Sequence, residues 1–282
     1  MTNKELKSID LVSFTIIGTG INVLFSILIS IIMLIGFSVM IPNSFSIMIY
    51  LVPTIVFGTL ITCIFTYFSE GYLYNILSKK LKSITIDIDE NGRINRISTT
   101  STALMVSLIS LIMAIIVYLA MFFITPLLLS TIMQILMMSG QMAVASILYQ
   151  GLILISNPVT IGILLIIIFV ITFVTTLVAT FIYNILGNSN RGATVELSED
   201  DKFTVIDSIN PLNLAIVIAA ISLVINIVIA IVNIITGTNP VSAVLSIVPG
   251  LVSSFITGFL IALFYNFLAP KLGKLKVELI NA

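Results

Sequence analysis

Long apolar stretches alternate with short charged segments along this chain of 282 residues. Every Lys, Arg, Asp and Glu falls within residues 4–10, 70–96, 191–207 or 271–278. The three stretches between these segments carry no charge, and each is too long for a single membrane span of about 20 residues. Two spans in each stretch return the chain to the side that it left. The pattern therefore predicts a mainly α, polytopic membrane protein with about six transmembrane helices.

The apolar pattern places the spans at 11–40, 54–77, 102–124, 158–186, 211–235 and 249–268. The connections 44–53 and 241–249 are apolar, bounded by proline and too short to span, which favours re-entrant or interfacial half-helices. The middle connection, 125–157, is long and apolar. It has room for two further short spans, which would make eight.

Composition and charge indicate that the chain is a membrane protein and which way it is oriented. Hydrophobic residues make up 59% of the chain and charged residues only 9%, whereas about a quarter of an ordinary soluble domain is charged. With two spans per stretch, all twelve Lys and Arg residues lie on one side. The positive-inside bias makes that side cytoplasmic. We therefore expect a multi-pass protein of the cell membrane with both termini in the cytoplasm and a retained, uncleaved first span.

A Tyr-Asn pair followed by an alternating segment occurs three times. An apolar residue lies at the same distance after each asparagine, and an acidic residue follows it. The three sets are Tyr74, Asn75, Ile86 and Asp87; Tyr183, Asn184, Val195 and Glu196; and Tyr265, Asn266, Val277 and Glu278. The pattern predicts three repeats, 1–90, 91–200 and 201–282, within one membrane domain. Each would comprise a short strand, a helix, a connection, a second helix and a second strand, with Ser13, Ser101 and Asn210 as N-caps of the first helices.

This ending resembles an uncharacterised two-helix transmembrane family, a domain of unknown function best known from actinobacteria. Its copies end in Tyr-Asn, a glycine pair and a short strand. Gly192 and Gly273 approximate the glycine pair, whereas the first copy has Leu81-Lys82-Ser83 instead. The resemblance implies three tandem copies of that fold and supplies no chemistry.

The charged segments have the alternation of half-buried strands. Ile84, Ile86 and Ile88 alternate with polar residues, and the following Asn91-Gly92 is typical of a hairpin turn. A second hairpin would turn at 198–202. Segments 5–9 and 275–279 are the natural closing pair, since closure removes exposed edges. We predict a six-stranded, pseudo-threefold β cap or small barrel that the two termini close.

Small and polar residues recur at four-residue steps along the second helices, and so share one helix face. The three rows are Thr59, Cys63, Tyr67, Gly71 and Asn75; Thr172, Thr176, Thr180 and Asn184; and Gly250, Ser254, Gly258, Ala262 and Asn266. We expect these rows to pack the second helices around a pseudo-threefold axis, and a narrow pore is the alternative. The asparagines at the helix ends are expected to cap carbonyl groups, with a ring of ligands as the alternative.

Few residues have the chemistry of a reactive site. Met133, Met137, Met138 and Met142 offer thioethers, which can bind Cu(I) but are more often apolar filler; Glu70 is a weak functional candidate near a helix end. The chain has no histidine and a single cysteine, Cys63. We therefore expect no catalytic residue, cofactor, metal or nucleic acid, with the lipid bilayer and other membrane proteins as partners. The function indicated is a non-catalytic scaffold or interaction subunit. The alternative is a passive channel or permeation pathway along the pseudo-threefold axis.

Overall fold

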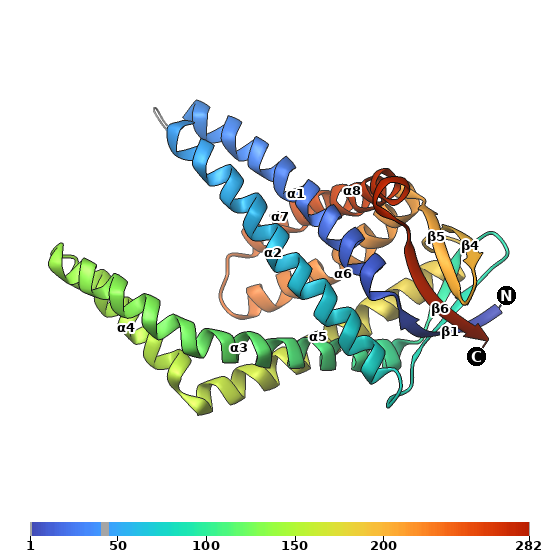
Figure 1. The fold of residues 1–282 in the computed structure, drawn as a ribbon, viewed down its shortest axis with the longest axis horizontal. Coiled ribbons are helices and arrows are strands. Elements are labelled where there is room, and N and C mark those ends of the chain that lie inside the picture. Colours follow the sequence, from blue (N-terminus) through green and yellow to red (C-terminus); the bar gives the residue numbers. More distant parts are fainter. Residues whose placement is uncertain (1, 41–44, 282) are drawn as a thin grey trace. The chain divides into compact units, whose positions relative to one another are not determined.

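A computed structural model describes residues 2–40 and 45–281, and Figure 1 shows their helices and strands. The chain divides into two compact units, one comprising Met1–Thr102 with Leu177–Ala282 and the other Ala103–Thr176. Six helices in the described part of the chain are long and apolar enough to cross a membrane. The prediction of about six such helices is confirmed.

The first pair of helices is longer than predicted. Helix α1 covers Leu11–Met40 and α2 covers Phe45–Leu77. A separate half-helix was expected at 44–53, and this prediction is wrong for residues 45–53, which form the first turns of α2. Residue 44 lies outside the described residues. The helix continues through Pro53. A continuous helix satisfies its own backbone polar groups, whereas a separate irregular segment does not.

The third pair encloses a short extra helix. Helix α6 covers Pro211–Ile235, α7 covers Pro240–Leu245 and α8 covers Ile247–Leu272. The N-cap of α7 is Asn239, whose side-chain Oδ1 accepts a hydrogen bond from the Val241 amide (2.9 Å). A half-helix was expected at 241–249; α7 accounts for residues up to Leu245, whereas residues 247–249 form the first turn of α8.

The middle helices are α3 (Thr99–Met138), α4 (Met142–Ser156) and α5 (Pro158–Asn188). The expected span 102–124 instead runs on through Pro126 as one helix. The two further spans proposed for 125–157 are wrong. Apart from the end of α3, that segment holds only α4, which at about 22 Å is shorter than the ~30 Å hydrocarbon core.

Six strands form one antiparallel sheet: β1 Thr2–Ile9, β2 Ile84–Ile88, β3 Ile94–Ile97, β4 Val195–Asp200, β5 Phe203–Ile209 and β6 Leu275–Asn281. Their order is β3-β2-β1-β6-β5-β4. The two terminal strands, β1 and β6, lie side by side (Figure 1). Leu6 is opposite Leu279. The predicted hairpins and the predicted pairing of the termini are both confirmed.

The two edges of the sheet are joined to each other. The Ile94 amide donates to the Ala193 carbonyl (2.9 Å), and the Val195 amide donates to the Gly92 carbonyl (3.0 Å). An isolated bridge pairs Arg93 with Thr194 between them. The six strands therefore form a closed cycle of neighbours. The contact that closes this cycle lies between β3 and β4 rather than at the termini.

Glycines make this contact between the two sheet edges possible. A Cβ on Gly192 would lie 2.2 Å from the Ile94 carbonyl oxygen, and a Cβ on Gly187 would lie 2.0 Å from that of Asn95. Both distances are far below van der Waals contact with a backbone atom that cannot move aside. Only glycine permits the α5–β4 segment to approach β3 so closely.

Candidate functional site

Three tyrosines hold the sheet to the helix ends. From here on, a unit is one of the three repeats, 1–90, 91–200 and 201–282, and not one of the two compact parts of the chain. The strand before the first helix of a unit is its leading strand, and the strand after its last helix is its trailing strand. Each hydroxyl donates to a leading-strand carbonyl: Tyr74 to Leu6 (2.6 Å), Tyr183 to Ile94 (2.7 Å) and Tyr265 to Ile206. All three tyrosines are buried.

Two of the same hydroxyls contact the trailing strands. The Ala193 amide donates to the Tyr183 oxygen (3.3 Å), and the Leu275 amide donates to the Tyr265 oxygen (3.2 Å). Tyr183 and Tyr265 thus link the leading strand of their own unit to the start of its trailing strand.

Each asparagine beside these tyrosines makes a two-hydrogen-bond contact with one leading-strand residue. The Ile9 amide donates to Asn75 Oδ1 (2.8 Å), and Asn75 Nδ2 donates to the Ile9 carbonyl (2.8 Å). Asn184 repeats the exchange with Ile97 at 2.8 and 2.9 Å. Asn266 does so with Ile209 at 2.9 and 2.8 Å. The prediction that these asparagines cap their own helices is wrong, because their amides are bonded to a strand. We call each Tyr-Asn pair with its strand partners a joint.

Neighbouring units are linked by a second set of bonds. The residue before each first helix donates its amide to the trailing strand of another unit: Asp10 to Lys276 (3.0 Å), Ser98 to Thr85 (2.9 Å) and Asn210 to Thr194 (2.9 Å). A residue is bulged out three positions before each donor, where the register of the leading strand shifts. These residues are Lys7, Asn95 and Asp207. The same backbone arrangement therefore occurs three times around the sheet.

The helix starts differ from two of the three predicted N-caps. The Asp10 carboxylate accepts a hydrogen bond from the Ser13 amide (2.8 Å), and Asn210 accepts one from the Asn213 amide (3.0 Å). Asn210 is confirmed as an N-cap. Ser13 and Ser101 lie inside helices that begin at Leu11 and Thr99. Ile209-Asn210 therefore occupies in the third repeat the place that Ile9-Asp10 has in the first.

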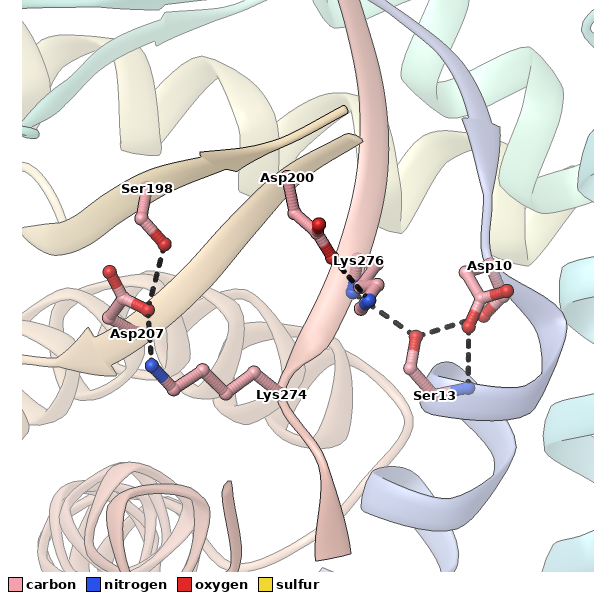
Figure 2. Close-up of polar contacts among 7 residues, drawn as sticks. All are labelled: Asp10, Ser13, Ser198, Asp200, Asp207, Lys274 and Lys276. Carbon is pink, nitrogen blue, oxygen red and sulfur yellow. Dashed lines mark hydrogen bonds and ion pairs between the residues drawn. The ribbon is translucent and has the colours of Figure 1, made fainter. Parts of the chain in front are cut away.

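Two ion pairs and a set of hydrogen bonds connect β4 and β5 with the start of β6 (Figure 2). Asp207 Oδ1 lies 2.7 Å from Lys274 Nζ and accepts from Ser198 Oγ (3.0 Å). Lys274 and the Ser198 hydroxyl therefore lower the pKa of Asp207. Asp200 lies 2.5 Å from Lys276 Nζ and raises the pKa of that lysine.

The β2–β3 turn is stabilised in a similar way. The Arg93 amide donates to Asp89 Oδ1 (2.9 Å), and the Asn91 amide donates to the same oxygen (3.0 Å). These backbone donors, with Arg93 the largest influence, lower the pKa of Asp89. Gly92 has a φ of +71°, which suits the turn.

A polar pocket of about 400 Å³ lies against β1, β2 and β3. It is lined by Asn3, Thr85, Asp87, Arg96 and Ser98. Asp87 stands opposite both Asn3 and Arg96 in the sheet. Its Oδ1 is buried and has no hydrogen-bond partner among the described residues. A buried carboxylate oxygen without a donor is unusual in a folded protein, and here it belongs to a residue that lines a polar pocket.

The small-residue rows pack helix against helix within a unit. A Cβ on Gly258 would lie 3.0 Å from the Ala215 Cα of α6, and Ser254 Oγ donates to Ser222 Oγ of α6 (2.6 Å). In the first unit, the Tyr67 ring lies against Gly18 of α1. The packing interpretation holds for these two rows, but their partner is the first helix of the same unit rather than the other second helices around an axis.

The remaining sequence candidates are not assembled into a site. Met137, Met138 and Met142 are 50%, 89% and 63% exposed at the end of α3 and the start of α4. Glu70 lies on α2 and makes no ion pair with any described residue. Nowhere in residues 2–40 and 45–281 do three His, Cys, Asp or Glu side chains form a group that could hold a metal ion.

Sequence reasoning missed the partners of the Tyr-Asn pairs, although the threefold spacing had marked the pairs themselves. The partner strands lie about 60 to 90 residues earlier in the chain, and nothing local identifies them. Comparisons with protein-family models, curated proteins and solved structures find no match to this chain.

Proposed function

We propose that the protein is a non-catalytic scaffold of the cell membrane, which holds other membrane proteins at its cytoplasmic sheet. Its six long helices cross the bilayer, and both termini lie in the cytoplasm. The single observation that carries the proposal is the polar pocket at Asp87, because it is the one described pocket on the sheet that combines polar lining with a buried, unpartnered carboxylate oxygen.

Two independent features support the topology. Each unit starts and ends in the same sheet, because every leading strand and every trailing strand is paired or bridged within that sheet. All twelve Lys and Arg residues fall in or beside these strands. A sheet on one side of the membrane with this much positive charge fits the cytoplasmic side.

The repeated joint supports an origin by triplication. In each of the units 1–90, 91–200 and 201–282, the strand residues that bond the tyrosine and the asparagine, the bulged residue and the residue before the first helix have the same spacing. Three tandem copies of a two-helix unit, such as the resemblance to the uncharacterised actinobacterial family implies, account for this. The middle copy then carries α4 as an addition.

Asp87 and Arg96 give the pocket both an acceptor and a donor. A partner's Lys, Arg or amide group in the pocket would lie beside the Asp87 carboxylate, and a partner carboxylate would pair with the exposed Arg96. Charge-assisted hydrogen bonds of this kind fix orientation at an interface. No atom of the pocket needs to react for this function.

Site-specific photo-crosslinking in native membranes tests the proposal. A crosslinker at Asn3, which lines the pocket, should give one discrete adduct that is lost in Asp87→Ala. It should persist in the matched control Glu90→Ala, because Glu90 is exposed and lies outside this pocket. The absence of a discrete adduct, together with ion conductance of the purified protein in a planar bilayer, would favour the channel and overturn the scaffold.

A further inference from the structure

A second pocket lies among the helices rather than on the sheet. It encloses about 600 Å³ between α1, α2 and α8 and reaches the strands at Ile209 and Leu275. Its described lining residues are apolar or aromatic, with Asn22, Tyr67, Thr257 and Tyr265 as the polar ones, and none of them is charged. We call this pocket the helix groove.

The helix groove is long. On α1 it runs from Phe14 to Ile29, a rise of about 22 Å along the helix. One leaflet contributes about half of a ~30 Å hydrocarbon core, or roughly 15 Å. The groove is therefore longer than one leaflet and has room for an extended lipid chain, and its helices are among those apolar enough to cross a membrane.

Two polar groups inside the groove have unused bonding capacity. Asn22 Nδ2 donates to Tyr67 Oη (2.6 Å) and to the Gly18 carbonyl (3.1 Å). Tyr67 acts as acceptor in that bond, so its own hydroxyl hydrogen has no acceptor among the described residues. Asn22 Oδ1 likewise receives no described donor. The groove thus offers one donor and one acceptor side by side.

We propose that the helix groove binds one uncharged, hydroxyl-bearing membrane lipid of the diglyceride class. The Tyr67 hydroxyl donates to an ester carbonyl of the lipid, Asn22 Oδ1 accepts from its free hydroxyl, and one acyl chain lies along α1. A phospholipid fits less well, because its charged head group would meet no charge in the groove, and burying an unpaired charge is costly. This site is separate from the polar pocket of the sheet.

Native mass spectrometry of the purified protein, with a diglyceride and phosphatidylcholine as probes, tests the proposal. The wild-type protein should bind one diglyceride and bind phosphatidylcholine at least tenfold more weakly. Tyr67→Phe keeps the ring against Gly18 but removes the donor, and should weaken diglyceride binding up to about tenfold. Tyr72→Phe, at an exposed tyrosine of the same helix, should have no effect.

A second pair of variants tests the groove by filling it. Thr257→Trp places a large ring at a lining residue and should abolish diglyceride binding, whereas Ile256→Trp, at a neighbouring exposed residue outside the lining, should not. Thermal midpoints in detergent confirm that each variant is folded. Equal binding of both probes by the wild type, or unchanged diglyceride binding by folded Thr257→Trp, would overturn the proposal.

Discussion

Asn266 and Ile209 exchange two hydrogen bonds across a separation of 57 residues, with the Asn266 amide nitrogen donating to the Ile209 carbonyl and the Ile209 amide donating back. The carboxamide thereby acts as a short piece of strand at the end of α8. Because Asn75 and Asn184 do the same, the sheet is attached to the helices at three equivalent places.

Loss of one joint asparagine should destabilise the protein. Asn184→Ala leaves the Ile97 amide and carbonyl without partners, and each unpaired group costs about 1–3 kcal/mol. We expect a destabilisation of at least about 2 kcal/mol, with faster hydrogen exchange of the Ile97 amide. Asn188→Ala is the matched control, since Asn188 is exposed on the same helix. Equal thermal midpoints for the two variants would show that the joint contributes nothing.

The long-range partners explain what could be predicted from the sequence. The alternation of Ile84, Ile86 and Ile88 predicted strand β2, and uncharged stretches predicted the long helices. The helix starts were harder, because each has two polar residues spaced three apart, such as Asp10 and Ser13. Either fits an N-cap by composition, and only the bond from the Ser13 amide to Asp10 decides between them.

The polar pocket and the joint partners could not be predicted for a different reason. The register that places Asp87 between Asn3 and Arg96 depends on which strands are neighbours. The alternation gives the face of each residue but not its neighbours across the sheet. The sequence therefore predicted the six strands and the pairing of the two terminal strands, but not the contact between β3 and β4.

Gly258→Leu should separate α8 from α6. Any Cβ at this position meets the Ala215 backbone at 3.0 Å, and overpacking of this kind typically costs about 1–3 kcal/mol. We expect a lower thermal midpoint in detergent. Gly58→Leu on α2 serves as the control, because nothing lies within 4 Å of its added Cβ. If both variants melted together with the wild type, the α6–α8 packing described here would be incorrect.

Acid should weaken the polar contacts of the sheet that involve Asp207 and Asp89. The pKa of Asp207 is lowered by Lys274, and that of Asp89 by the Arg93 amide, so the stability they contribute is present above their unfolded pKa of about 3.9 and lost as the pH falls through the lower folded value. Unfolding of the wild type should therefore become easier below about pH 4. The Asp207→Asn variant should show a shallower dependence, and an unchanged pH profile would show that the ion pair with Lys274 has no influence.

Cysteine accessibility in intact cells tests the central claim, that the sheet and both termini face the cytoplasm. In a Cys63→Ala background, single cysteines at Asn91 and Glu199 mark the two hairpin turns, and one at Thr238 marks the α6–α7 connection. A membrane-impermeant maleimide should label Thr238→Cys in intact cells, and Asn91→Cys and Glu199→Cys only after permeabilisation. Labelling of the hairpin cysteines from outside, with Thr238→Cys protected, would contradict the account.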